Sequence, residues 1–128
     1  MKKTTFYLLK ELLNQIDFLS YPRADDLSVY INLIEKNEKA LNKKTPEDIL
    51  CTFIELTVKK IEEYFIFCGA PAQVIFHGGG IENKYLMRRI KETIKTEITT
   101  IDRLIPSKYV EAAAFAYLAF KERAVLFK

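Results

Sequence analysis

Three consecutive glycines, Gly78-Gly79-Gly80, form the stretch of this sequence with the clearest capacity for binding chemistry. They follow the apolar run 73–76, which predicts a buried β-strand, and precede Asn83, which can cap a helix. Glycine backbone can take positive φ and lie close to another molecule. Beyond the carboxyl end of a strand, free amides and a helix start favour an anionic or polar ligand such as a nucleotide. The spacing matches neither a Walker loop nor a dinucleotide fingerprint, so a tight strand-to-helix connection without a ligand stays an equal alternative.

Other residues capable of chemistry are few and dispersed. Glu111 is expected in the first turn of the last helix, where an acid is favourable without any further role. The lone histidine, His77, fits a packed or solvent-edge side chain better than a catalyst. Cys51 and Cys68 fall on one predicted helix about 25 Å apart, too far for a disulfide, and are expected as small buried residues in a reducing compartment. One histidine and two distant cysteines cannot make a tetrahedral zinc site, so no metal ligands are predicted.

The first third of the chain is predicted to be helical. Apolar residues at helical spacing predict one helix over 4–19 and a second, shorter one over 26–35. The inward side of the second helix is predicted to carry Leu27, Tyr30, Ile31 and Ile34. The polar stretch 37–44 is expected to be a loop.

The remainder alternates helices and strands. A capping threonine and a proline start a long helix over 46–68, which strands 73–76 and 97–101 follow. The helix between the strands begins at Asn83, and the last helix begins at Pro106. The inward side of the helix after Asn83 is predicted to carry Leu86, Met87, Ile90 and Ile94. This order predicts an α/β fold.

Size and charge limit the remaining options. A chain of 128 residues is expected to be a single domain, 1–128, with a helical lead-in over 1–45 and an α/β part over 46–128. Its 20 basic and 17 acidic residues are interspersed, which disfavours a nucleic-acid surface. No apolar run is long enough for a signal peptide or a membrane span, so a cytoplasmic protein without membrane contact is expected.

Three motifs in order resemble one enzyme family. The first is the glycine turn with Asn83 and a helix that contains Leu86-Met87. The second is Ile105-Pro106 followed by the Glu-Ala-rich segment 110–119, and the third, looser one is the segment from Leu12 through Pro22 to Leu33. Together they are similar to the C-terminal lobe of anhydro-N-acetylmuramic acid kinases, which belong with sugar kinases and actin. The resemblance implies a truncated, ribonuclease H-like fold with a short sheet packed by helices.

The resemblance also implies a site and a reaction. Gly78, Gly79, Gly80 and Asn83 would lie against the adenosine of ATP, with magnesium as its companion ion. Glu111 falls on the family glutamate near the cleft, where a buried carboxylate could hold a sugar hydroxyl or anchor the helix terminus. The family reaction belongs to peptidoglycan recycling: water opens the 1,6-anhydro bond of the muramyl sugar while the γ-phosphate of ATP passes to O6.

The sequence departs from the family at several positions. The Gly-Thr-Ser-x-Asp-Gly phosphate loop and the water-activating aspartate segment do not occur in these residues. The segment 22–28 loses the family's lysine, threonine and glycine, and Ile101 and Leu104 replace a family aspartate and glycine. These residues alone are therefore expected to be catalytically inactive. Either a separate chain supplies the first lobe, or the domain is a non-enzymatic remnant that self-associates or binds another protein.

Overall fold

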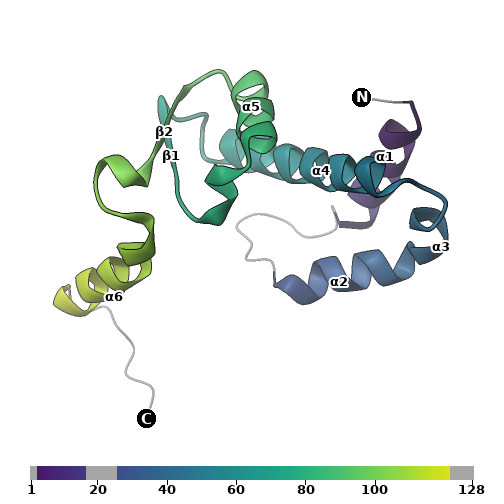
Figure 1. The fold of residues 1–128 in the computed structure, drawn as a ribbon. Helices are drawn as coiled ribbons and strands as arrows, with labels where there is room; N and C mark the ends of the chain where they lie inside the picture. The colour runs from purple at the N-terminus through teal and green to yellow at the C-terminus, as the bar shows by residue number, and fades with distance from the viewer. Residues whose placement is uncertain (1–2, 17–25, 122–128) are drawn as a thin grey trace, which may run out of the picture.

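The structure is a computed structural model that describes residues 3–16 and 26–121, with side chains from residue 6 onward (Figure 1). Helices dominate, and one two-stranded parallel sheet supplies the α/β character that the sequence predicted. In chain order the elements are α1 (Lys3–Ile16), α2 (Leu27–Lys36), α3 (Glu38–Leu41), α4 (Pro46–Phe67), β1 (Gln73–Phe76), η1 (Gly79–Glu82), α5 (Lys84–Thr93), β2 (Glu97–Thr100), η2 (Ile101–Arg103), η3 (Ser107–Tyr109) and α6 (Val110–Phe120).

The 22-residue helix α4 is the element on which both α1 and α5 pack. It begins where the sequence predicted, because the Thr45 hydroxyl accepts a hydrogen bond from the Asp48 backbone N–H at 3.2 Å and Pro46 occupies the first turn. Its last residue is Phe67, Cys68 is its C-cap, and Gly69 follows with a φ of 80°. The Ala70 N–H then closes the end on the Phe65 carbonyl at 3.0 Å, the 6→1 hydrogen bond of a helix-terminating turn.

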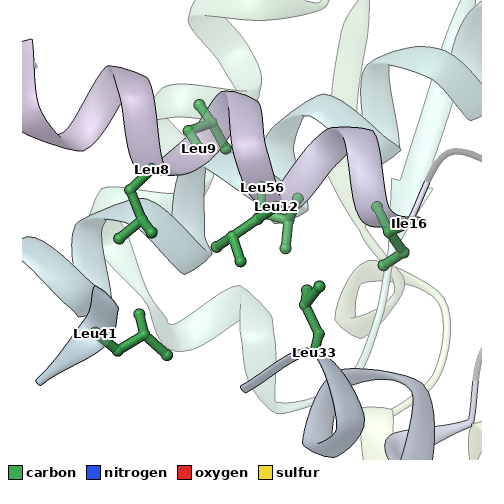
Figure 2. Close-up of a cluster of buried hydrophobic side chains, with 7 residues drawn as sticks. All are labelled: Leu8, Leu9, Leu12, Ile16, Leu33, Leu41 and Leu56. Atoms are coloured by element: carbon green, nitrogen blue, oxygen red, sulfur yellow. The ribbon is translucent and has the colours of Figure 1, made fainter. Parts of the chain in front are cut away.

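The first hydrophobic cluster lies between α1 and the first half of α4, with α2 and α3 closing it below (Figure 1). Figure 2 shows its buried side chains, which are Leu8, Leu9, Leu12, Ile16, Leu33, Leu41 and Leu56. Leu12 and Leu56 are 0% and 1% exposed, and each contributes about 1.5–3 kcal/mol through removal of its side chain from water. The crossing of α1 and α2 is also held by two hydrogen bonds between the amides of Gln15 and Asn37, at 3.0 and 2.9 Å.

The second cluster joins the later part of α4 to the sheet and to α5. Val58, Ile90 and Ile94 are its buried residues, and Val74, Phe76 and Ile98 of the strands pack against them. The predicted inward side of α5 is therefore confirmed. This packing holds the sheet against α4 and α5.

An ion pair connects α4 with α5 beside this cluster. The guanidinium of Arg89 donates to both carboxylate oxygens of Glu55, with Nε–Oε1 at 2.6 Å and Nη2–Oε2 at 3.1 Å. Glu55 is only 4% exposed, so its charge depends on this partner. Glu92 on α5 also accepts from Arg89. The two glutamates raise the pKa of Arg89 above its ordinary value, which keeps the guanidinium protonated.

The helical lead-in agrees with the predictions only in part. Helix α1 forms where it was predicted as far as Ile16, and the rest of the predicted helix and the turn at Tyr21-Pro22 lie outside the described residues. In α2, Tyr30 packs against the core as predicted, but Leu33 is the buried residue. Three predicted inward residues are exposed, namely Leu27, Ile31 and Ile34. The side of α2 that meets the cluster carries Val29, Tyr30 and Leu33, and the apolar spacing within α2 alone does not reveal which side that is.

Three further expectations also failed. The stretch 37–44 contains the one-turn helix α3, because Leu41 is drawn into the first cluster. Strand β1 is not buried on both sides, since Ile75 on its outward face is 43% exposed. Cys68 is exposed and Cys51 is half-buried, with its sulfur 3.6 Å from the Tyr85 hydroxyl.

Helix α6 lies away from both clusters, as the yellow-green end of the ribbon in Figure 1 shows. Every residue of α6 after Val110 is exposed, although its sequence is almost entirely apolar. Phe115 and Phe120 are 71% and 79% exposed. An apolar helix that does not pack on a hydrophobic core offers a surface to which another protein segment can bind.

Among the helices that the structure describes, none combines the length and the apolar character needed to cross a membrane.

Candidate nucleotide-binding site

The parallel pairing of β1 and β2 brings two loops to one edge of the sheet. Phe76 at the end of β1 pairs with Thr100 at the end of β2, so the loops that follow the two strands leave the sheet side by side. A cavity of about 300 Å³ opens there between the two loops. It is lined by Gly78, Gly79, Ile81, Glu82, Asp102, Ser107 and Lys108. This is the position at which ligands of α/β sheets bind.

The glycine turn forms one wall of this cavity and is open to it. Gly78 has a φ of 89°, a conformation that L-residues rarely adopt, and it leads into the short helix η1. A Cβ built on Gly78 or Gly79 would have nothing within 4 Å, whereas one on Gly80 would lie 3.8 Å from Cδ2 of Leu86. The turn is therefore not packed under other side chains, and the backbone at 78–79 is accessible to a ligand.

Asn83 has a clear structural role. Its Oδ1 accepts a hydrogen bond from the Leu86 backbone N–H at 3.0 Å, so it caps α5 as the sequence predicted. Its own N–H is bonded to the Gly80 carbonyl at 3.1 Å, which links the cap to the glycine turn. Asn83 does not line the cavity. Its contact with a nucleotide stays a prediction.

The opposite wall carries a carboxylate that the sequence reasoning did not select. Oδ1 of Asp102 accepts hydrogen bonds from the backbone N–H and the hydroxyl of Ser107, at 2.9 and 2.8 Å. Both bonds favour the ionised form and lower the pKa of Asp102 below its ordinary value. Lys108, also in the cavity lining, stands with its ammonium 4.9 Å from the ring centre of Tyr109. Ligands of α/β sheets bind beyond the carboxyl ends of strands, and this rule, which supported the glycine turn, could also have pointed to Asp102 just after β2.

A second, larger cavity of about 590 Å³ lies along the later part of α4 and the strand β1. Its wall is mostly apolar, with Ile61, Phe65 and Val74 among its residues, and its charged group, Lys60, is paired with Glu63 at 2.9 Å. Size alone would favour this cavity, or an equally large one along α5 that Lys84, Arg88 and Lys91 border, as a binding site. We assign the candidate site to the smaller one, because several polar and charged groups converge there at the carboxyl edge of the sheet.

Comparison with known proteins identifies the family. The family model described as anhydro-N-acetylmuramic acid kinase matches residues 6–126. The chain belongs to the anhydro-N-acetylmuramic acid kinase family. The resemblance that the three motifs indicated is thereby confirmed.

Curated members of the kinase family align along most of the chain. The anhydro-N-acetylmuramic acid kinase of Pseudomonas savastanoi pathovar phaseolicola is 33% identical over 117 residues, which cover 88% of this chain and 32% of the relative. That of Pseudomonas syringae pathovar tomato gives the same values. The kinase of Haemophilus influenzae is 33% identical over 130 residues, covering 88% of this chain and 34% of the relative. The chain thus spans about a third of the length of these relatives.

Two other residues considered from the sequence lie apart from the cavity. Glu111 is in the first turn of α6, as one of the two interpretations of the sequence expected, and its side chain is exposed, which does not agree with the other interpretation, a buried carboxylate. Its role towards a sugar substrate stays a prediction. His77 is exposed and does not line the cavity.

The kinase family implies ATP with magnesium. The open turn and the polar cavity fit part of a nucleotide. For magnesium the fit is poor: Glu82 and Asp102 are the carboxylates of the cavity lining, and no group of three or more potential ligands occurs in the part of the chain that the structure describes. Magnesium bound with ATP takes most of its ligands from phosphates and water. The described residues alone therefore do not make a magnesium site.

Proposed function

We propose that these 128 residues form the C-terminal, nucleotide-side part of an ATP-dependent anhydro-N-acetylmuramic acid kinase that acts in the cytoplasm. The family membership supports the reaction class, which the resemblance describes as opening of the 1,6-anhydro bond and phosphorylation of O6. One observation carries the nucleotide-side assignment: an unobstructed glycine turn, Gly78-Gly79, borders a polar cavity at the carboxyl edge of a parallel sheet.

The same proposal holds that these residues bind nucleotide but do not transfer phosphate by themselves. Phosphoryl transfer requires ligands for the phosphates, magnesium and a group that orients the nucleophile. The 128 residues contain no Gly-Thr-Ser-x-Asp-Gly loop. Supplied with a chain that carries such a lobe, the pair is expected to phosphorylate anhydro-N-acetylmuramic acid. An inactive pair at saturating substrate would reject completion by a second chain.

Calorimetric titration with magnesium-ATP tests the nucleotide site. Gly79→Val places a branched side chain at the cavity wall, where a Cβ has free space, so the fold is expected to survive. We expect ATP affinity to fall by about tenfold or more. Ala119→Val, which adds similar bulk on exposed α6, is the matched control and should bind as the wild type does. Equal affinity of Gly79→Val and wild type, or a wild type that does not bind ATP, would contradict the assignment.

A second candidate function is a non-enzymatic, self-associating or protein-binding domain. The observation that favours it is α6, whose apolar residues are exposed, with Phe115 at 71%, Tyr117 at 61% and Phe120 at 79%. Light scattering over a range of concentrations, for wild type and Phe115→Ser, tests self-association. A strict monomer at high protein concentration would reject it. ATP binding that Gly79→Val abolishes would favour the kinase-derived function.

A further inference from the structure

The charges around the candidate site are not those of a phosphate site. Two carboxylates, Glu82 and Asp102, line the cavity together with a single ammonium group, Lys108. A triphosphate placed among them would face more negative than positive charge, and like charges at this range repel. Hydroxyl groups would instead be attracted to these carboxylates, because an ionised carboxylate is a strong hydrogen-bond acceptor.

Asp102 is held in one orientation. Ser107 binds its Oδ1 with two donors, at 2.9 and 2.8 Å, and its other oxygen has no hydrogen-bond partner among the residues that the structure describes. Asp102 belongs to the lining of the same cavity as Gly78 and Gly79. Its pKa is lowered, so it remains ionised near neutral pH. The cavity thus offers a fixed anionic acceptor with an unused oxygen.

We propose that Asp102 accepts hydrogen bonds from the ribose hydroxyls of the nucleotide, and that the cavity holds the nucleoside while the phosphates lie outside it. This inference rests on the proposed nucleotide-side function and deepens it. A ribose carries two vicinal hydroxyls, which match a carboxylate; the same pairing of an acidic residue with ribose is found in dinucleotide-binding folds. A volume of about 300 Å³ is at the small end for ligand pockets and suits a nucleoside moiety better than a complete nucleotide triphosphate.

The alternative is that Asp102 only closes the turn to Ser107. A purely structural role would not make the protein distinguish nucleosides with and without ribose hydroxyls. The test therefore measures the affinity of two proteins, wild type and Asp102→Asn, for two ligands, adenosine and 2′,3′-dideoxyadenosine. Calorimetry or NMR titration gives the four affinities. Asp26→Asn is the matched control: Asp26 caps α2 through a 3.0 Å bond to the Ser28 N–H and lies outside the cavity lining.

We expect wild type to bind adenosine about 10- to 100-fold more tightly than the dideoxy compound, the range for a charge-assisted hydrogen bond. Asp102→Asn should remove most of this preference and barely change dideoxyadenosine binding. ADP should bind wild type within about threefold of adenosine. The proposal places the phosphates outside the cavity, and a phosphate that did contact the protein would change the affinity by more than about threefold. Asp26→Asn should retain the full preference.

Each other outcome overturns the inference. If wild type binds both nucleosides equally, no acceptor for the hydroxyls exists. This comparison uses only the wild-type protein, so it does not depend on whether a variant folds. If Asp102→Asn keeps the preference while Glu82→Gln loses it, the acceptor is Glu82. If ATP binds and Gly79→Val weakens it but Asp102→Asn has no effect, the proposed function stands and only this inference falls. If wild type binds neither adenosine nor ATP, both fall.

Discussion

Replacing Arg89 by leucine leaves the carboxylate of Glu55 buried between α4 and α5 without its guanidinium. The Glu55 side chain is 5% exposed and accepts two charge-assisted bonds from Arg89. Removing one partner of a fully buried pair costs about 3–5 kcal/mol of stability. The Arg89 side chain is itself 30% exposed, so water partly screens the pair, and we expect a smaller loss of about 2–3 kcal/mol.

Urea unfolding followed by circular dichroism measures this loss as a shift of the transition midpoint at constant m-value. The matched control is Arg88→Leu on the same helix. Its side chain is 64% exposed, lies 3.9 Å from Glu92 and stands 5.1 Å from the ring centre of Tyr85, so its loss should cost no more than about 1 kcal/mol.

The double variant Glu55→Leu/Arg89→Leu completes the cycle. It is expected to regain much of the stability lost in Arg89→Leu, because an apolar pair avoids the buried unpaired charge. The reasoning is refuted if Arg89→Leu is no more destabilising than Arg88→Leu. It is also refuted if the double variant is less stable than the two single losses together predict.

Two further predictions concern the loops that form the site. Asn83→Ala should lower stability by about 1 kcal/mol, because it removes the bond to the Leu86 N–H that caps α5, whereas Asn83→Asp keeps the acceptor and should stay near wild type in thermal unfolding. For Asp102 the folded-state pKa lies below its ordinary value of about 3.9, so its stabilising bonds are complete above that pH and are lost as pH falls through the lowered pKa. Ser107→Ala removes the hydroxyl donor and should move the pKa of Asp102 back upward in a carboxyl NMR titration; an unchanged pKa would show that the hydroxyl does not stabilise the carboxylate.

The sequence by itself determined the elements whose signals are local. The start of α4, the cap at Asn83 and the conformation required of Gly78 each depend on residues within a few positions, and the structure confirms the first two and shows positive φ at the third. The two strands and the inward side of α5 were also predicted, because their periodicity is carried by the segment itself. The family resemblance was visible for the same reason, since its motifs are short.

Only the tertiary structure decided which distant residues meet. Glu55 and Arg89 are 34 positions apart, and nothing near either residue indicates the other. Leu33, not its apolar neighbours, is buried because of where α2 touches α1. Asp102 and the glycine turn line one cavity because β1 and β2 pair in parallel with their ends in register. Local propensity acts over a few residues, whereas these contacts depend on how whole elements pair and pack. The sequence therefore predicted the glycine turn of the candidate site but not its partner Asp102.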